Sequence, residues 1–301
     1  MSQPAADSET TKGALAAALG FLLWGIVPAY WKQMQSIPAF ELITHRIVWS
    51  LALLLAVQAW RGRLGLLRGG FGSTRAVGLN LLSAVFLAAN WTIYVWGVNT
   101  GHVIECSLGY FLTPLANVAM GRLLLKEQLR PLQWTAIGLA VAGVLLLLWR
   151  LGHAPWIALS LAATWSNYAI LKKKSALGPM TGLTVETILL FPLAAGALLW
   201  WQHTGTGALG RVDARLHAYV LSAGIITAVP LLLFGYGAQR IRLVTLGLLQ
   251  YLAPTVQFFI GLLLYREPFD SGQLQAYALI WIGLLLYTAD SFWSQRRRLF
   301  G

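Results

Sequence analysis

The chain has 301 residues, of which 57% are hydrophobic and only 11% are charged. Soluble domains carry about 25% charged residues, so the composition excludes an ordinary soluble domain and indicates an integral membrane protein. The formal net charge of +12 would suit a nucleic-acid partner, but the basic residues are spread over short connections between apolar runs, where they act as topology signals. We therefore expect a lipid bilayer and no nucleic acid as partners.

Apolar runs of about 17 to 22 residues recur along the whole chain, and each is long enough to cross a hydrocarbon core of about 30 Å as a helix. Their Leu, Gly and Ala content fits helices rather than the alternating strands of outer-membrane barrels. The runs lie at residues 13–31, 40–60, 76–97, 106–125, 132–149, 155–171, 180–201, 217–236, 244–264 and 273–291. The sequence thus predicts an all-α membrane protein with ten transmembrane helices.

The distribution of basic residues predicts the orientation of these helices. When alternate connections are assigned to opposite sides, 16 of the 22 Lys and Arg residues fall on the side of both termini, five fall on the other side, and Arg46 lies inside a span. The positive-inside rule then places both termini in the cytoplasm. The connections are short, so no soluble domain is expected, and the single cysteine, Cys106, excludes an intrachain disulfide.

The sequence of the segment Glu105–Glu127 is similar to that of Thr245–Glu267, which lies 140 residues later and aligns with it without gaps. The offset of 140 or 141 extends over nearly the whole chain and divides it into two halves of five spans. Because five is odd, the second half must enter the membrane from the opposite side, which makes the halves inverted repeats and is typical of transporters with a site between the halves. The predicted divisions are a cytoplasmic tail at 1–12, the first repeat at 13–150, the second repeat at 151–291 and a basic tail at 292–301.

One face of the fourth span carries polar and kink-forming residues at helical spacing, namely Tyr110, Pro114 and Asn117. Gln250, Pro254 and Gln257 occupy the matching face of the ninth span. Because a proline removes an intrahelical hydrogen bond, we expect Pro114 and Pro254 to be hinges.

Ionisable residues at membrane depth are expensive and are therefore candidates for function. His45 and Arg46 lie in the second span, and the repeat superposes His45 on Glu186 in the seventh. In a structural reading, Arg46 reaches outward or pairs with Glu41 or Glu105, and His45 caps a carbonyl. In a functional reading, these groups line a central cavity, bind a charged substrate group and, in His45 and Glu186, exchange protons during transport.

Amide, phenol and indole groups complete the predicted cavity, although the same groups also join membrane helices to one another. Some of Trp24, Trp31, Trp49, Trp91, Trp96 and Trp165 are expected to form stacking walls for a flat ligand, while most tryptophans in such chains are interfacial anchors. The candidate substrate-binding residues are His45, Arg46, Asn90, Trp91, Tyr110, Asn117, Glu186, Gln250, Tyr251 and Gln257.

The fourth and ninth spans each end on a glutamate, Glu127 and Glu267. Equivalent places in two copies indicate a role in the fold, and we expect each carboxylate to bond the start of a following helix.

Several segments together resemble one known family, the RarD proteins, in the EamA branch of the drug/metabolite transporter superfamily. The resemblance runs from about residue 12 to 298 and is carried by ITHRIVWS, NWTIYVWGVNTGHVIECSLGYFLTPL, TGLTVETILLFP, IITAVPLL and RLVTLGLLQYLAPT. It implies ten helices in two inverted EamA repeats, residence in the bacterial inner membrane, and a secondary transporter that exports small metabolites, such as amino acids, or amphipathic drugs.

Two other classes remain as alternatives, a membrane-embedded enzyme and a membrane scaffold without transport. The sequence has no HExxH motif, no acidic pair in DDxxD spacing and no suitably spaced Ser/His pair, so no catalytic residue, cofactor or metal is expected. Solute flux into proteoliposomes distinguishes a carrier from a scaffold.

Overall fold

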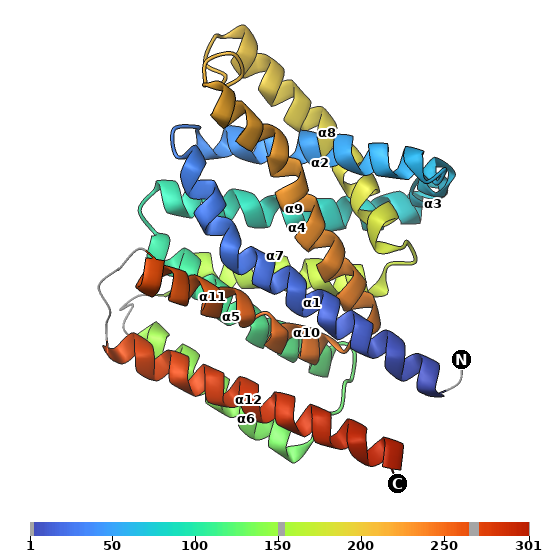
Figure 1. Cartoon of the computed structure of the whole chain (residues 1–301), viewed down its shortest axis with the longest axis vertical. Coiled ribbons are helices and arrows are strands. Elements are labelled where there is room, and N and C mark those ends of the chain that lie inside the picture. The colour runs from blue at the N-terminus through green and yellow to red at the C-terminus, as the bar shows by residue number, and fades with distance from the viewer. Residues whose placement is uncertain (1–2, 150–153, 265–270, 301) are drawn as a thin grey trace.

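The computed structural model describes residues 3–149, 154–264 and 271–300, and every regular element in these ranges is helical (Figure 1). The predicted all-α membrane fold class is confirmed, while the repeat boundary at 150 and 151 and the residue Glu267 lie outside the described ranges. The α-helices are α1 (Gln3–Trp31), α2 (Ala39–Trp60), α3 (Arg68–Phe71), α4 (Thr74–Asn99), α5 (Val103–Leu123), α6 (Pro131–Trp149), α7 (Trp156–Lys174), α8 (Pro179–His203), α9 (Ala214–Arg240), α10 (Leu243–Leu249), α11 (Leu252–Phe259) and α12 (Ser271–Phe300). Two short 3-10 turns, Lys32–Met34 and Leu64–Leu67, and a π-helical turn, Ile260–Leu264, complete the elements.

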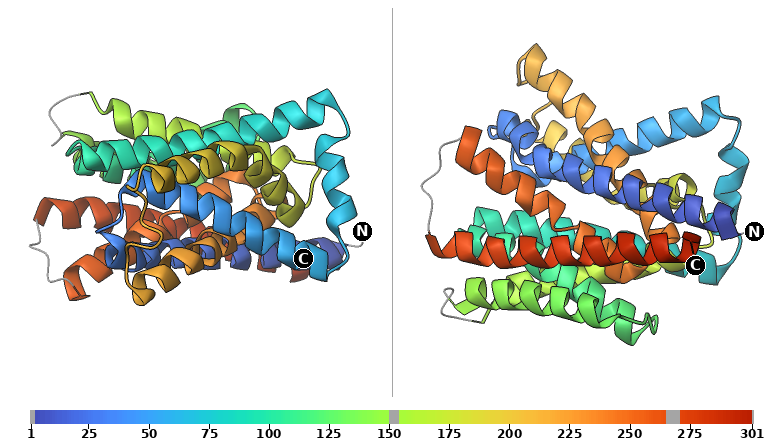
Figure 2. Two further views of the ribbon diagram at one scale, coloured as in Figure 1. Left: turned by 90° about the horizontal axis from the view of Figure 1, so that it is seen from above. Right: turned by 60° about the horizontal axis from the view of Figure 1, so that its bottom comes forward.

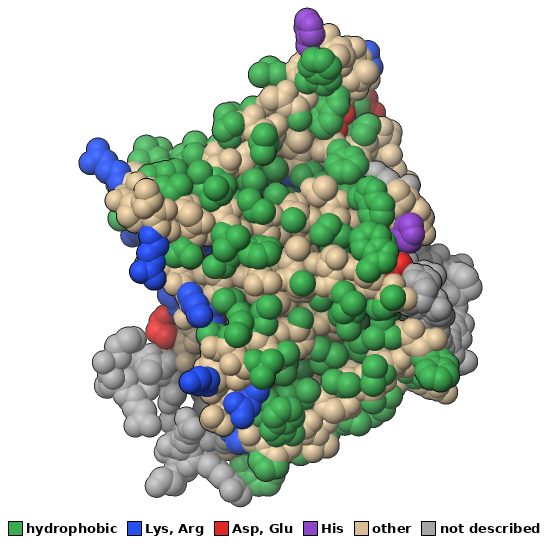
Figure 3. Space-filling model, turned by 180° about the vertical axis from the view of Figure 1, so that it is seen from behind, with side chains coloured by type: hydrophobic (Ala, Val, Ile, Leu, Met, Phe, Trp, Pro, Cys, Tyr) green, Lys and Arg blue, Asp and Glu red, His purple; other side chains and the backbone are tan. Residues whose placement is uncertain are grey.

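Seven helical segments of the described chain are long and apolar enough to cross a membrane. They are Ser8–Met34, Ala39–Trp60, Thr74–Val98, Pro131–Trp149, Pro179–His203, Ala214–Arg240 and Leu243–Leu264. The other three predicted runs coincide with helices α5, α7 and α12. On the face shown in Figure 3, hydrophobic side chains cover the middle of the bundle and Lys and Arg side chains gather toward one end.

The helix starts have local causes in the sequence. The Ser73 hydroxyl accepts a hydrogen bond from the backbone N–H of Ala76 at 3.1 Å and so caps α4, and the Asp213 carboxylate accepts one from Leu216 at 2.7 Å and caps α9. These two caps lie 140 positions apart. The same kind of signal therefore opens equivalent helices in the two halves.

The predicted span at 244–264 is not one continuous α-helix. It divides into α10 and α11 at Gln250 and Tyr251, followed by the π-helical turn. At the division the N–H groups of Tyr251 and Ala253 donate to Leu248 and Gln250, three residues back, which is the tighter 3-10 pattern. Pro254 cannot donate an N–H here. Pro114, its counterpart in the first half, lies inside the continuous helix α5.

Helices that are distant in sequence pack together in the bundle. Helix α6 lies beside α12, as the views in Figures 1 and 2 agree, α5 crosses α10, α1 packs on α9 and α11, and α7 packs on α4 and α5. At the α6–α12 contact, a Cβ added to Gly143 would lie 2.6 Å from the carbonyl oxygen of Ala276, and one added to Gly283 would lie 2.5 Å from that of Ala136. Glycine is needed at both places because the two backbones touch.

Candidate functional site

A cavity of about 140 Å³ lies among helices from both halves of the chain, which is close to the volume of about 150 Å³ that holds a benzene-sized molecule in other proteins. Six of the ten predicted substrate-binding residues line it, together with Pro254. These six are Arg46, Asn90, Trp91, Tyr110, Gln250 and Gln257.

The cavity occupies the half of the bundle that is far from the chain termini. It is lined by the second half of α1, from Phe21 to Trp31, by Asn90 to Val95 near the end of α4, and by Leu161 and Trp165 in the first half of α7. Arg46, near the start of α2, lies at the same level. The helices thus contribute side chains at a common depth rather than along their whole length.

Arg46 is held inside this cavity by a hydroxyl and two indoles. Its Nε donates a hydrogen bond to the Thr227 hydroxyl at 3.0 Å. Its guanidinium carbon lies 4.4 Å from the ring centroid of Trp91 and 4.9 Å from that of Trp31, within the range of cation–π attraction. Neither expected partner receives it: Glu41 accepts the N–H of Ala208 at 2.5 Å, and Glu105 accepts that of Ile157 at 3.2 Å.

The amide side chains divide between helix contacts and the cavity. Asn90 donates to the carbonyl of Leu161 and the hydroxyl of Thr164, both at 3.0 Å, and so joins α4 to α7. Asn117 donates to the Oε1 of Gln250 at 3.0 Å and is fully buried. Both predicted roles, cavity lining and helix contact, therefore meet in Asn90 and Gln250.

Aromatic rings form much of the cavity wall. Trp24 and Trp165 meet edge to face with centroids 5.2 Å apart, and the rings of Tyr94 and Tyr110 lie 5.5 Å apart. The indole N–H of Trp165 is buried and has no hydrogen-bond partner within the described residues. The wall therefore combines flat apolar surfaces with a donor that has no acceptor among the described residues.

The other four predicted residues do not line this cavity. Asn117 and the fully buried Tyr251 lie between the helices, where the Tyr251 hydroxyl donates to the carbonyl of Phe111 at 3.2 Å. His45 is buried beside Glu41, with its Nε2 3.7 Å from a carboxylate oxygen, and neither of its ring nitrogens has a hydrogen-bond partner within the described residues. Glu186 lies in a separate polar cluster.

That cluster is a buried ion pair with two hydroxyls. The Lys172 ammonium lies 3.0 Å from Glu186, and both side chains are 2% exposed. The hydroxyl of Ser83 donates to the same carboxylate at 2.7 Å and that of Tyr168 at 3.3 Å. Lys172 was not among the predicted site residues, because it belongs to a run of three lysines at the end of a span, which is typical of a topology signal.

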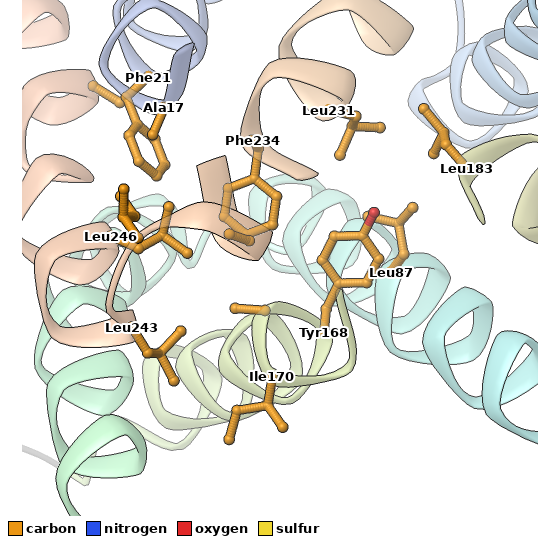
Figure 4. Packing of buried hydrophobic residues seen from close by; sticks show 14 of the residues in the cluster. Ala17, Phe21, Leu87, Tyr168, Ile170, Leu183, Leu231, Phe234, Leu243 and Leu246 are labelled. Atoms are coloured by element: carbon orange, nitrogen blue, oxygen red, sulfur yellow. The ribbon is translucent and has the colours of Figure 1, made fainter. Parts of the chain in front are cut away.

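A packed apolar layer closes the bundle between the cavity and the end that holds the termini. Figure 4 shows Phe21, Tyr168, Phe234 and Leu246 pointing toward one another from α1, α7, α9 and α10. The rings of Tyr168 and Phe234 are stacked with centroids 5.9 Å apart. The Lys172–Glu186 pair lies at the same level of the bundle, because Tyr168 stacks on Phe234 and also donates a hydrogen bond to Glu186.

Glu127 binds the start of a helix, but not the helix that follows it in sequence. Its two carboxylate oxygens accept the N–H groups of Leu243 and Val244 at 2.7 and 3.0 Å, at the first turn of α10. Free N–H groups at a helix start favour a negative charge. Glu127 therefore joins the end of α5 to the other half of the chain.

Thr227 and Phe21 contribute to the site but were not among the predicted site residues, although Thr227 lies in the segment IITAVPLL. Thr227 supplies the hydroxyl that binds Arg46. The equivalent position in the first repeat holds the apolar Leu87. Phe21 reads as one more apolar residue of the first span. Only the crossing of helices reveals these two contributions.

Comparisons with known proteins agree with this architecture. The model of the EamA-like transporter family matches residues 11–149. The chain is 38% identical over 294 residues to "Protein RarD" of Salmonella typhi, covering 96% of this chain and 99% of that protein, and 38% identical to "Uncharacterized transporter YojE" of Bacillus subtilis, covering 93% and 95%. It is 31% identical to "Chloramphenicol-sensitive protein RarD" of Pseudomonas aeruginosa, covering 93% and 94%. A solved structure, "Crystal structure of protein", has the same fold, with a TM-score of 0.74 at 22% identity over 93% of this chain and 98% of that one.

Proposed function

This chain belongs to the RarD family of EamA-type transporters, and on that premise we propose that it is a secondary transporter that exports small organic solutes across the bacterial inner membrane. The observation that carries the proposal is the cavity, which receives residues from both halves of a bundle with an apolar exterior. Transporters of this general design bind their solute between repeats and expose it to each side in turn.

We propose further that α5, α7 and α12 also cross the membrane, which makes ten spans in two inverted repeats. The paired helix contacts support this: α1 packs on α9 as α7 packs on α4, and α1 packs on α11 as α7 packs on α5. The reciprocal glycine contacts, Gly143 on Ala276 and Gly283 on Ala136, obey the same exchange of halves. A pseudo-twofold axis would produce each of these pairs.

The proposed orientation has both termini in the cytoplasm. The gathering of Lys and Arg side chains toward one end of the bundle supports it (Figure 3). With this orientation the cavity lies in the outer half of the membrane, and the layer around Tyr168 and Phe234 closes the cytoplasmic side. The structure then corresponds to the stage of the cycle before or after release to the outside.

The solutes that we propose are small metabolites such as amino acids, or amphipathic drugs. The aromatic walls and the mixed amide and phenol groups suit a solute with a flat apolar part and a polar head. A relative that carries chloramphenicol in its name agrees with a drug-sized substrate. We propose that Arg46, Asn90, Trp91, Tyr110, Gln250 and Gln257 contact the solute, while Asn117 and Tyr251 support them from below.

Pro254 is the better placed of the two proposed hinges. It follows directly after the division between α10 and α11 and lines the cavity. Motion there changes the direction of α11, and with it Gln257, while α10 stays bound to Glu127. Pro114 lies in an uninterrupted helix and packs against α10, where a Cβ on Gly247 would lie 2.7 Å from its carbonyl.

The test is solute flux in proteoliposomes that contain the purified protein. Radiolabelled phenylalanine and chloramphenicol serve as probes, and uptake is compared with that of protein-free vesicles. Gln257→Trp fills the cavity and should abolish protein-dependent flux of any accepted probe. Leu263→Trp is the matched control, because Leu263 is 72% exposed on the outside of the bundle. Protein-dependent flux that survives Gln257→Trp unchanged would contradict transport through this cavity, and a lack of flux with a broad solute panel would favour a scaffold.

A further inference from the structure

Arg46 has features of a ligand-binding group rather than of a structural one. Within the described residues it has no carboxylate partner, and it contacts the Thr227 hydroxyl and the rings of Trp31 and Trp91. Of the described residues that line the cavity, it is the one with a formal charge. A positive charge inside a membrane is costly, so an unpaired one in a cavity is expected to meet a counter-charge during function.

The contacts of Arg46 leave one edge of the guanidinium available. Its Nε is occupied by Thr227, and the indoles of Trp31 and Trp91 attract its π-face. The two Nη groups therefore keep the planar fork that matches a carboxylate through two parallel hydrogen bonds. The packing fixes this fork, so less side-chain entropy is lost on binding.

Two other polar groups of the wall have donors free for an acceptor-rich ligand, while the side-chain oxygens of Asn90 and Gln257 remain as acceptors, because these two amides donate through their NH₂ groups. The indole N–H of Trp165 has no acceptor within the described residues. The Oε1 of Gln250 is taken by Asn117, while its Nε2 has no partner in the described part of the chain. Both are donors. The described lining contains no Asp or Glu side chain that could bind an ammonium group.

We propose that the cavity selects monoanionic solutes, in which a carboxylate binds the Nη edge of Arg46 and a flat apolar body lies among the tryptophan and tyrosine rings. This inference rests on the proposed transport function and narrows its substrate class to acids, so zwitterionic phenylalanine and neutral chloramphenicol are expected to bind less tightly than 3-phenylpropanoate. Neutral solutes of the same shape lose the charge-assisted hydrogen bonds, and cationic ones meet a like charge in a low-dielectric site.

The test compares three probes with one body and different heads: 3-phenylpropanoate, 3-phenylpropanamide and 3-phenylpropylammonium. Binding to the purified full-length protein is followed by tryptophan fluorescence, because Trp24, Trp31, Trp91 and Trp165 line the cavity. We expect the wild-type protein to bind the carboxylate at least about tenfold more tightly than the amide, as charged hydrogen bonds predict, and the ammonium probe most weakly.

The variants assign this preference to Arg46. In Arg46→Gln the ratio between carboxylate and amide should fall to about one, and in Arg46→Lys, which keeps the charge but not the fork, it should be intermediate. Arg63→Gln removes an exposed arginine and should retain the full ratio. The wild-type comparison of probes needs no variant, so it decides the matter even if Arg46→Gln does not fold.

Equal binding of the three probes, or no binding of any, would overturn the proposed selectivity, as would a full ratio in Arg46→Gln. Flux in proteoliposomes distinguishes a failure of the proposed selectivity from a failure of the proposed transport function. Protein-dependent flux of the amide at the rate of the carboxylate would leave a transporter and overturn the anion selectivity. Carboxylate-selective binding without flux of any probe would support the anion selectivity and contradict the transport function.

Discussion

Trp24 and Trp165 lie one repeat apart in the sequence and touch in the structure, with ring centroids 5.2 Å apart and planes at 80°. Phe111 and Tyr251, also one repeat apart, touch as well, through a hydrogen bond of 3.2 Å. Two residues that a twofold axis exchanges can contact one another only close to that axis. The cavity, which Trp24 and Trp165 line, therefore lies where the proposed axis passes, and both halves act on whatever occupies it.

The reciprocal glycine contacts predict equal effects from two distant substitutions. Gly143→Leu and Gly283→Leu each place a side chain against the backbone of the opposite helix, at Ala276 and Ala136. Each should lower the free energy of unfolding by about 1–3 kcal/mol through overpacking. The drop in the thermal unfolding temperature should be similar in the two variants. Gly138→Leu, on the same α6 but with no atom within 4 Å of the added Cβ, should be neutral. Loss of stability in only one of the pair would count against the symmetry.

The buried ion pair predicts that one change costs more than two. Glu186→Gln leaves the Lys172 ammonium buried without its counter-charge, which should cost about 3–5 kcal/mol. The double variant Lys172→Met, Glu186→Leu removes both charges and should recover most of the loss. Thermal unfolding of the purified proteins measures both. A double variant no more stable than Glu186→Gln would show that the hydrogen bonds from Ser83 and Tyr168 matter more than the charges.

The hypothesis that Glu186 exchanges protons during transport stays a prediction with its own measurement. If it holds, the double variant should still exchange solute but lose any acceleration of flux by an imposed pH gradient. His45→Ala should weaken the same response. Wild-type flux that ignores the gradient would make the protein a facilitator and leave Glu186 as the partner of Lys172.

The contact between Glu127 and α10 predicts a loss of stability without a loss of the cavity. Glu127→Gln replaces one acceptor oxygen by an NH₂ group that faces a backbone N–H, at Leu243 or Val244. The expected cost is about 1–3 kcal/mol, seen as a lower unfolding temperature and lower expression, while probe affinity per folded molecule is retained. Glu9→Gln, which changes a solvent-facing ion pair, is the control and should leave the unfolding temperature nearly unchanged.

The two prolines should differ when each is replaced by alanine. Pro254→Ala restores an N–H beside the division between α10 and α11 and allows a regular helix, so we expect slower flux with unchanged or higher thermal stability. Pro114→Ala lies within a continuous helix and should change flux less. Flux per reconstituted protein is the measurement. Normal flux in Pro254→Ala would make the division a static feature.

The order of helices and most of their limits followed from the sequence, because long apolar runs and short connections leave a membrane chain few alternatives. The break near Pro254 did not follow, although Pro114 occupies the same place in the repeat. The two prolines have the same local chemistry, yet α5 continues through Pro114, while the chain before Pro254 is divided at Gln250 into α10 and α11. The local sequence around a proline therefore does not determine whether the helix continues through it.

The candidate site divides in the same manner. A polar residue inside an apolar run is easily seen in the sequence, and burying it in a membrane costs free energy unless it has a partner or a function. This argument alone indicated Arg46, Asn90 and Gln250. Their partners come from other helices: Thr227 for Arg46, Leu161 for Asn90 and Asn117 for Gln250. Glu186 was equally visible, yet Lys172 and Tyr168 draw it into a separate cluster. Which groups need a partner follows from the amino-acid sequence, because burying a polar side chain costs free energy wherever it lies. Which partner each group has depends on how the helices cross, and it is seen only once the bundle is assembled.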